Sequence, residues 1–256
     1  MLYKITFSPT GGTDRIADLL GDYLSKSLKA KTSGINLLVR DPDRRQSLLR
    51  ETDIAVIAMP VFGGRIPAVA ASRLRMIRGN GSRAIVAAVY GNRAYDDSLR
   101  ELADIAEASG FRVIAAIAAI AEHSIIHEIA QGRPDDEDRS QLARMTEEIA
   151  GKLDRNDDSR PSVPGSWPYK VFHGIPLGTY ATDDCIFCTS CALECPVGAI
   201  PEERPNQPSN GSCISCMRCV AVCPVQARRP DDAVTEVIRH KISPVCVERR
   251  EAELFI

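Results

Sequence analysis

The sequence predicts an α/β fold for its first 155 residues, with helices on both faces of a parallel sheet. Short apolar strands alternate there with amphipathic helical segments, which is the pattern of a doubly wound sheet. The third, fourth and fifth predicted strands are nearly continuous apolar runs, as expected for strands that are buried on both faces. The predicted strands are Leu2–Phe7, Ile35–Val39, Asp53–Met59, Arg83–Tyr90 and Phe111–Ala121. They fit a five-stranded parallel sheet with the order 2-1-3-4-5.

Helices are predicted in the segments between these strands. After Thr13, apolar residues recur at helical spacing on one side only, which indicates a helix that packs on the sheet. Further helices are predicted at Ala68–Ile77, Asp96–Ser109 and Asp138–Leu153. The alternation ends near Asp154, so residues 1–155 are expected to form the first domain.

Three further segments are expected after this domain. Residues 156–179 contain several prolines and glycines without any periodicity, so they are expected to form a linker. Trp167, Tyr169 and Phe172 within this linker indicate that it is anchored on a neighbouring surface. A cysteine-rich module is expected over residues 180–230, and a helical C-terminal tail over residues 231–256.

The composition is that of a globular protein with little net charge. Hydrophobic residues make up 44% of the 256 residues, charged residues 26%, and the formal net charge is −2. This balance argues against nucleic-acid binding and against membrane attachment through a basic surface. The longest apolar run, Val113–Ala121, is far shorter than the ~20 residues of a membrane span. No signal sequence precedes the first strand, so the protein is expected to be cytoplasmic.

Nine cysteines are the unusual feature of the composition, and eight of them lie between Cys185 and Cys223. In a reducing compartment such a cluster indicates metal binding or catalysis before it indicates disulfides. The eight cysteines form two runs with the spacing C-x2-C-x2-C-x3-C-P. This is the spacing of bacterial ferredoxins, in which three cysteines of one run bind one [4Fe–4S] cluster and the fourth binds the other cluster.

This spacing assigns four cysteines to each cluster. Cluster one is expected to use Cys185, Cys188, Cys191 and Cys223, and cluster two is expected to use Cys195, Cys213, Cys216 and Cys219. A pair of structural zinc sites is the alternative, although zinc sites seldom use three successive cysteines at two-residue gaps. The module resembles a ferredoxin with two [4Fe–4S] clusters, and the resemblance implies an α+β fold and one-electron transfer.

A glycine-containing loop lies directly between the first predicted strand and the first predicted helix. Ser8-Pro9-Thr10-Gly11-Gly12-Thr13 combines glycines, hydroxyl groups and a helix N-terminus, and all three features favour phosphate binding. The loop lacks the lysine of a Walker motif and the G-x-G-x-x-G of a dinucleotide site, so it suits a single terminal phosphate and does not support NAD(P)H as a donor. An ordinary strand–turn–helix connection is the alternative.

The pattern S-x-T-G-x-T resembles the phosphate loop of flavodoxins, whose FMN also rests on the loops after the third and fourth strands. The resemblance implies that residues 8–13 hold the FMN phosphate. It also implies that backbone and amide groups of the two later loops approach the edge of the flavin ring, and that Phe62 or Tyr95 stacks on a ring face. The residues expected to bind FMN are Ser8, Thr10, Gly11, Gly12, Thr13, Pro60, Val61, Phe62, Gly63, Gly64, Tyr90, Gly91, Asn92, Arg93, Tyr95 and Asp97.

The chain as a whole resembles the flavodoxin–ferredoxin fusion proteins of anaerobes. The resemblance covers almost the whole sequence, including VFGGRIP at Val61–Pro67 and YGNRAYDD at Tyr90–Asp97. It implies a flavodoxin-like domain with FMN, a dicluster module with two [4Fe–4S] clusters, and electron transfer to a redox protein partner. The alternatives are a flavin-dependent reductase of a small organic acceptor and, third, a redox or iron sensor. The oligomeric state does not follow from the sequence.

Two histidines follow the fifth predicted strand. His123 and His127 lie close to Glu122 and Glu128, at the edge of the sheet where a cofactor is expected. They are candidates for metal binding or for donating a proton to the flavin or a substrate, with His123 as the candidate catalytic residue. Capping or packing roles are the alternative.

Arg65 and Arg93 lie in the two predicted flavin loops. They are either surface charges or residues that screen the charge of a reduced flavin. Cys246, the ninth cysteine, has no partner at ligand spacing and is expected to be a buried thiol.

Overall fold

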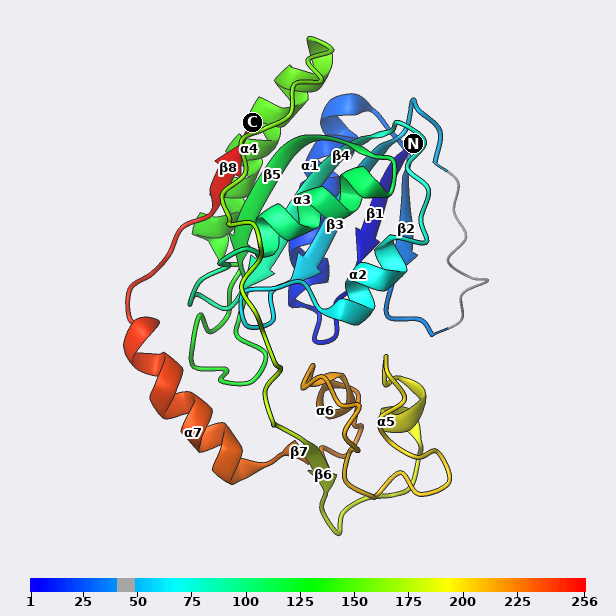
Figure 1. Cartoon of the computed structure of the whole chain (residues 1–256), viewed down its shortest axis with the longest axis vertical. Coiled ribbons are helices and arrows are strands. Elements are labelled where there is room, and N and C mark those ends of the chain that lie inside the picture. Colours follow the sequence, from blue (N-terminus) through cyan, green and yellow to red (C-terminus); the bar gives the residue numbers. More distant parts are fainter. Residues whose placement is uncertain (41–48) are drawn as a thin grey trace.

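The computed structural model describes residues 1–40 and 49–256, and its largest element is a six-stranded sheet (Figure 1). The strand order is β2-β1-β3-β4-β5-β8, in which β1 to β5 are parallel and β8 is antiparallel to β5. The flavodoxin-like order 2-1-3-4-5 predicted from the sequence is confirmed. The strands are β1 (Leu2–Thr6), β2 (Thr32–Asn36), β3 (Ile54–Pro60), β4 (Arg83–Tyr90), β5 (Arg112–Ile120) and β8 (Glu253–Phe255).

Helices cover both faces of this sheet. They are α1 (Gly12–Leu28), α2 (Ala68–Leu74), α3 (Ser98–Ala108) and α4 (Asp136–Asp154). In Figure 1, α1 and α4 lie together on one face, and α2 and α3 lie on the other. Helix α1 buries Ile16, Leu20 and Leu24 on the side that faces the sheet, as its one-sided apolar pattern requires. Within the described residues, no helix combines the length and the apolar character of a membrane span.

The second strand begins earlier than the sequence pattern indicated. The prediction followed the apolar run Ile35–Val39, whereas β2 spans Thr32–Asn36. Asn36 Oδ1 accepts a hydrogen bond of 2.8 Å from the N–H of Leu38, and this side-chain turn ends the strand. Leu37 and Leu38 are nevertheless buried in the core. Their apolar character therefore marks burial and not strand conformation.

The cysteine-rich part of the chain lies beyond the carboxyl ends of the parallel strands, at the bottom of Figure 1. Two short helices and a two-stranded antiparallel sheet form it, namely β6 (Thr179–Ala181), α5 (Ser190–Leu193), α6 (Arg218–Ala221) and β7 (Arg228–Pro230). Its hydrophobic core is small and includes two of the cysteines, Cys191 and Cys219. A module of this size ordinarily needs a metal or another cross-link to be stable.

The C-terminal tail is helical only in part. Helix α7 (Asp232–Ile242) forms where the apolar stripe predicted it, and a 3-10 turn follows at Ser243–Val245. The chain then returns to the large sheet, where β8 pairs with β5 and places Leu254 beside Ile117. The prediction of a helical tail over residues 231–256 missed this strand, because three residues are too few to show an alternating pattern.

Candidate functional site between the sheet edge and the cysteine module

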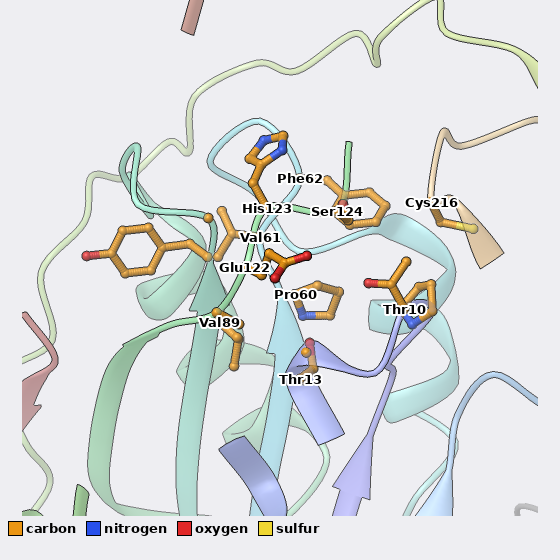
Figure 2. Close-up of a pocket in the computed structure, with 15 residues that line it drawn as sticks. Thr10, Thr13, Pro60, Val61, Phe62, Val89, Glu122, His123, Ser124 and Cys216 are labelled. Carbon is orange, nitrogen blue, oxygen red and sulfur yellow. The ribbon is translucent and has the colours of Figure 1, made fainter. Parts of the chain in front are cut away.

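A pocket lies at the carboxyl edge of the parallel sheet (Figure 2). It is formed by the loop after β1 and by residues at or just beyond the carboxyl ends of β3, β4 and β5, which is where open α/β sheets bind their ligands. Eight of the residues that the sequence predicted for FMN line it: Thr10, Gly12, Thr13, Pro60, Val61, Phe62, Tyr90 and Gly91. The pocket is also lined by residues outside that prediction: Pro9, Val89, Ala121, Glu122, His123, Ser124 and Cys216.

The loop before α1 has the local structure of an anion-binding turn. Gly11, the residue before the helix, has a φ of 89°, a left-handed conformation that glycine adopts without a steric penalty. Ser8 is buried, and its Oγ accepts a hydrogen bond of 2.9 Å from the N–H of Asp14. The N–H groups of Gly12 and Thr13 belong to the first helical turn, where no intrahelical acceptor exists. These N–H groups and the helix dipole are therefore suited to a phosphate.

The loop after β3 is a tight turn, of which only the first part faces the pocket. Two backbone hydrogen bonds of 2.9 and 3.1 Å join Phe62 and Arg65. Between them, Gly63 and Gly64 have φ values of 60° and 86°, which favour glycine at both positions. The ring of Phe172, from the linker, lies directly against Gly63 and leaves no room for a Cβ atom. Phe62 faces the pocket, whereas Gly63 contacts the linker.

Only the first part of the segment at the end of β4 faces the pocket, as in the loop after β3. Tyr90 and Gly91 line the pocket, but the following residues do not. The side-chain amide of Asn92 is buried and donates hydrogen bonds to the carbonyl oxygens of Cys246 (3.0 Å) and Glu248 (2.8 Å) in the tail. The side chain of Asn92, which was predicted to approach the edge of the flavin ring, therefore forms hydrogen bonds with the C-terminal tail.

Other polar residues of this loop also hold neighbouring segments. The carboxylate of Asp97 accepts hydrogen bonds from the N–H groups of Ser166 (2.8 Å) and Lys170 (2.6 Å) in the linker. Arg93 forms an ion pair with Asp96. The structure therefore places Arg93 and Asp97 outside the pocket, among contacts within the protein.

Tyr95 lies outside the pocket as well. Its ring packs edge-on against Tyr90 with 5.5 Å between the centroids, and its hydroxyl donates a hydrogen bond of 3.1 Å to Glu253 in β8. Burial is the main cause that raises the pKa of this hydroxyl, and the nearby Glu253 carboxylate adds to it. Two aromatic residues were expected to stack on a flavin. Phe62 lines the pocket, whereas Tyr95 contacts the tail.

His123 lines the pocket and is neutral at physiological pH. Burial of the imidazole lowers its pKa to about 4, and the nearby His127 adds to this effect. Its Nδ1 accepts hydrogen bonds from the N–H groups of Ile125 (3.2 Å) and Ile126 (3.0 Å), so Nε2 carries the proton. This geometry suits a hydrogen-bond donor and does not suit a general acid at neutral pH.

The other candidates near His123 are engaged in separate contacts. His127 is exposed and lies 2.7 Å from one oxygen of Glu122, whose other oxygen accepts from the N–H of Gly132. This backbone hydrogen bond is the largest cause that lowers the pKa of Glu122. Glu128 pairs with Arg239 of α7 at 2.8 Å. Within residues 1–40 and 49–256, no three potential ligands converge on a site for a single metal ion.

Arg65 fastens the linker to α3. It forms two hydrogen bonds of 2.8 Å with Glu101, donates one of 2.6 Å to the carbonyl oxygen of Lys170, and lies 4.9 Å from the centre of the Tyr169 ring. Since Arg65 does not line the pocket, it acts here as a structural cation. Cys246 is buried against Ile126, as expected.

The eight clustered cysteines surround two pockets in the cysteine module. One pocket is lined by Cys185, Cys188, Cys191 and Cys223, and the other by Cys195, Cys213, Cys216 and Cys219. The chain thus brings together the same two sets of four thiols that the spacing assigned to clusters one and two. The first pocket is nearer to solvent, because Cys188 is exposed and the apolar side chains of Ile186 and Val225 beside it are also exposed.

The loops around these pockets repeat one backbone geometry. In the first loop, the residues on either side of Cys188 are left-handed, with φ values of 56° at Phe187 and 62° at Thr189. In the second loop, Ser215 and Met217 flank Cys216 with φ values of 56° and 60°. Such alternation turns successive N–H groups toward one point and forms a concavity for anions. The repeat in the sequence is therefore also a repeat in structure.

Arginine side chains hold the cysteine module against the sheet edge. Arg218 of α6 pairs with Glu194 and donates a hydrogen bond of 3.2 Å to the carbonyl oxygen of Pro9 in the loop before α1. Arg73 of α2 is buried and donates one of 2.6 Å to the carbonyl oxygen of Pro196. With this docking, Cys216 lines the pocket of the first domain (Figure 2). Cysteine spacing carries no information about which face of the module docks, so this contact was not predicted.

The chain is similar to known proteins in both of its parts. Residues 184–228, which include all eight clustered cysteines, match the family model of a 4Fe-4S dicluster domain. Comparison with curated proteins finds no match.

Solved structures similar to the chain include several flavodoxins. A flavodoxin from Streptococcus pneumoniae TIGR4 is 22% identical, with a TM-score of 0.40, and the match covers 59% of this chain and 99% of that one. A flavodoxin from the domain Archaea is 14% identical, with a TM-score of 0.41, and the match covers 60% of this chain and 99% of that one. Flavodoxin 1 from Bacillus cereus is 15% identical, with a TM-score of 0.38, and the match covers 59% of this chain and 97% of that one. The observed strand order and the family match together show a flavodoxin-like fold followed by a 4Fe-4S dicluster domain.

Proposed function

We propose that the protein transfers electrons between FMN, bound in the pocket at the sheet edge, and two [4Fe–4S] clusters bound by the eight cysteines. FMN exchanges one or two electrons and each cluster exchanges one, so the pair links two-electron and one-electron chemistry. A redox protein is the external partner.

Three features of the pocket fit FMN. The turn at Gly11 and the first N–H groups of α1 suit its phosphate. The side chain of Phe62 offers apolar surface to a flavin ring, and the protonated Nε2 of His123 offers a neutral hydrogen-bond donor. The Glu122 carboxylate, which would repel a phosphate, has both oxygens engaged by Gly132 and His127.

The observation that carries the proposal is the position of Cys216. This thiol belongs to the four-cysteine set of cluster two and also lines the pocket proposed for FMN. Electron transfer depends steeply on distance, so a ligand shared between the two sites supports direct exchange between FMN and cluster two. Cluster one is expected to be the terminal carrier, because its Cys188 is exposed.

Anaerobic redox titration of the holoprotein tests this proposal. Flavin and cluster absorption are followed separately, and iron, acid-labile sulfide and flavin are quantified beforehand. The proposal predicts one FMN and two clusters in each chain, with reducing equivalents that redistribute between the two absorptions. Purified protein without flavin, or without acid-labile sulfide after anaerobic reconstitution, would contradict it.

The alternative of a flavin-dependent reductase has less support. It relies on His123, Arg65 or Tyr95 as a donor toward a small acceptor, but Arg65 is bound to Glu101 and Tyr95 to Glu253. Only His123 lines the pocket. Chemically reduced protein that is reoxidised rapidly and saturably by one organic acceptor would favour the reductase.

A further inference from the structure

Arg228, in β7, is a charged residue in the interior of the cysteine module. Its side chain is 2% exposed. The guanidinium donates hydrogen bonds to Thr179 Oγ1 (3.0 Å) and to the carbonyl oxygens of Thr179 (3.1 Å), Gln207 (2.7 Å) and Pro205 (3.2 Å). All of these acceptors are neutral. In the part of the chain that the structure describes, no carboxylate lies within ion-pair distance of this guanidinium.

A buried cation of this kind needs an anionic neighbour. Arginine remains protonated in proteins, and hydrogen bonds to a hydroxyl and to carbonyl oxygens engage its donors without balancing its net charge. Burial of an uncompensated charge is strongly unfavourable. An anion close to Arg228 would remove most of this free-energy cost.

The surroundings of Arg228 connect it to both four-cysteine pockets. Arg228 itself lines the pocket of Cys185, Cys188, Cys191 and Cys223. Thr179, which accepts two of its hydrogen bonds, lines the other pocket, and Thr179 Oγ1 lies 3.4 Å from the Sγ of Cys219. The guanidinium therefore lies between the two sites where thiolate-bound clusters are proposed.

We propose that the buried positive charge of Arg228 balances the negative charge of both clusters and raises the reduction potential of each. A reductant that gives one electron to a cluster adds one negative charge to that cluster, and no proton or bond is transferred in this step. A buried cation close by stabilises the more negative state, and net charge near a cluster is one of the factors that set its potential. This inference rests on the proposed clusters and does not depend on FMN.

Substitution of Arg228 with glutamine tests the proposal in the full-length holoprotein. Arg228→Gln removes the charge and retains a hydrogen-bond donor. Arg229→Gln is the matched control, since it removes a charge from the exposed neighbour on the same strand. The potentials of both clusters are measured by anaerobic titration with EPR detection. We expect Arg228→Gln to lower the ratio of reduced to oxidised cluster at a fixed potential about tenfold for each cluster, which is 59 mV for one electron, and Arg229→Gln to have a much smaller effect.

Arg228→Lys separates the effect of charge from that of packing. The lysine retains the positive charge and loses the planar arrangement of donors, so its cluster potentials should remain near those of the unaltered protein. Wild-type potentials in Arg228→Gln, a shift of one cluster alone, or an equal shift in the lysine variant would overturn the proposal. If neither variant assembles both clusters, the guanidinium is required for its hydrogen bonds and the charge proposal is likewise rejected. Absence of clusters from the unaltered protein would instead contradict the proposed function.

Discussion

At the scale of single residues, His123 shows how burial selects one chemical role from several. A histidine at the cofactor edge of a sheet is a candidate acid, base or metal ligand. Here two backbone N–H groups occupy Nδ1, and burial holds the pKa near 4. Only the neutral donor at Nε2 remains available to a ligand in the pocket.

This pKa makes stability depend on pH. The pKa of His123 is lower in the folded protein than its ordinary value of 6.5, so the unfolded chain binds the extra proton. The stabilisation is therefore complete above pH 6.5 and is lost as the pH falls toward 4. Between pH 7 and pH 5, this one group should reduce the free energy of unfolding by about 2 kcal/mol.

His123→Asn is the variant that measures this effect. The asparagine Oδ1 can accept the same backbone hydrogen bonds as Nδ1 but does not titrate. Urea unfolding at pH 7 and pH 5 should show a smaller loss of stability for the variant than for the unaltered protein. Equal losses in the two proteins would contradict the assignment of a low pKa to His123.

Arg218 is a cation that lies beside the loop of the proposed phosphate site, although it does not itself line the pocket. The loop over residues 8–13 contains no lysine or arginine, whereas the guanidinium of Arg218 lies 3.2 Å from the Pro9 carbonyl oxygen. We expect Arg218→Gln to weaken FMN binding about tenfold, a change of about 1.4 kcal/mol. Riboflavin, which lacks the phosphate, should bind the variant and the unaltered protein with equal affinity.

Fluorescence titration of flavin-depleted protein with both ligands separates charge from structure. Arg204→Gln is the control, because it removes one positive charge from an exposed position of the same module. A loss of riboflavin affinity equal to the loss of FMN affinity would mean that Arg218 acts only by holding the module in place.

At the scale of elements, the loops proposed to bind FMN are held by segments that come much later in the chain. Asp97 binds the linker, Asn92 binds the tail, and Gly63 lies beneath Phe172. Such contacts join loops that in an isolated α/β domain would face solvent. The linker and the tail therefore help to fix the conformation of the loops around the pocket.

Gly63→Ala should release the linker. An added Cβ atom there meets the ring of Phe172 and also requires a left-handed alanine. Left-handed backbone costs about 1–2 kcal/mol, and overpacking adds about 1–3 kcal/mol. Hydrogen exchange at the amides of Ser166 and Lys170, which donate to Asp97, should accelerate in this variant.

Gly132→Ala provides the matched control for this experiment. Gly132 also has a positive φ, of 76°, but a Cβ atom added there meets no other atom within 4 Å. It should bear the conformational cost alone and leave exchange in the linker unchanged. Equal acceleration in both variants would show that Phe172 does not hold the linker through Gly63.

Elements with a strong pattern could be predicted from the sequence, and those fixed by distant contacts could not. The buried strands β3, β4 and β5 and the cysteine repeat carry dense local signals, and the structure has each of these strands within a residue or two of its prediction. Strand β8 depends on pairing with β5, more than a hundred residues away in the sequence. The placements of Asn92, Tyr95 and Asp97 likewise depend on the tail and the linker, which no local pattern specifies.

At the scale of the whole molecule, the central feature is the docking of the cysteine module on the carboxyl edge of the sheet (Figure 1). Arg73 and Arg218 form this contact through hydrogen bonds to backbone carbonyl oxygens. It places one four-cysteine site beside the proposed flavin pocket and leaves the other nearer to solvent. The proposed electron path follows from this arrangement: FMN, cluster two, cluster one and then the partner.

Time-resolved electron exchange after photochemical reduction of the flavin tests this order most directly, with Cys216→Ser compared against Cys188→Ser. Iron and sulfide analysis first establishes which cluster each variant lacks. We expect Cys188→Ser to retain rapid exchange between the flavin and the remaining cluster, and Cys216→Ser to lose the rapid phase. Rapid exchange in Cys216→Ser together with its loss in Cys188→Ser would contradict the proposed path.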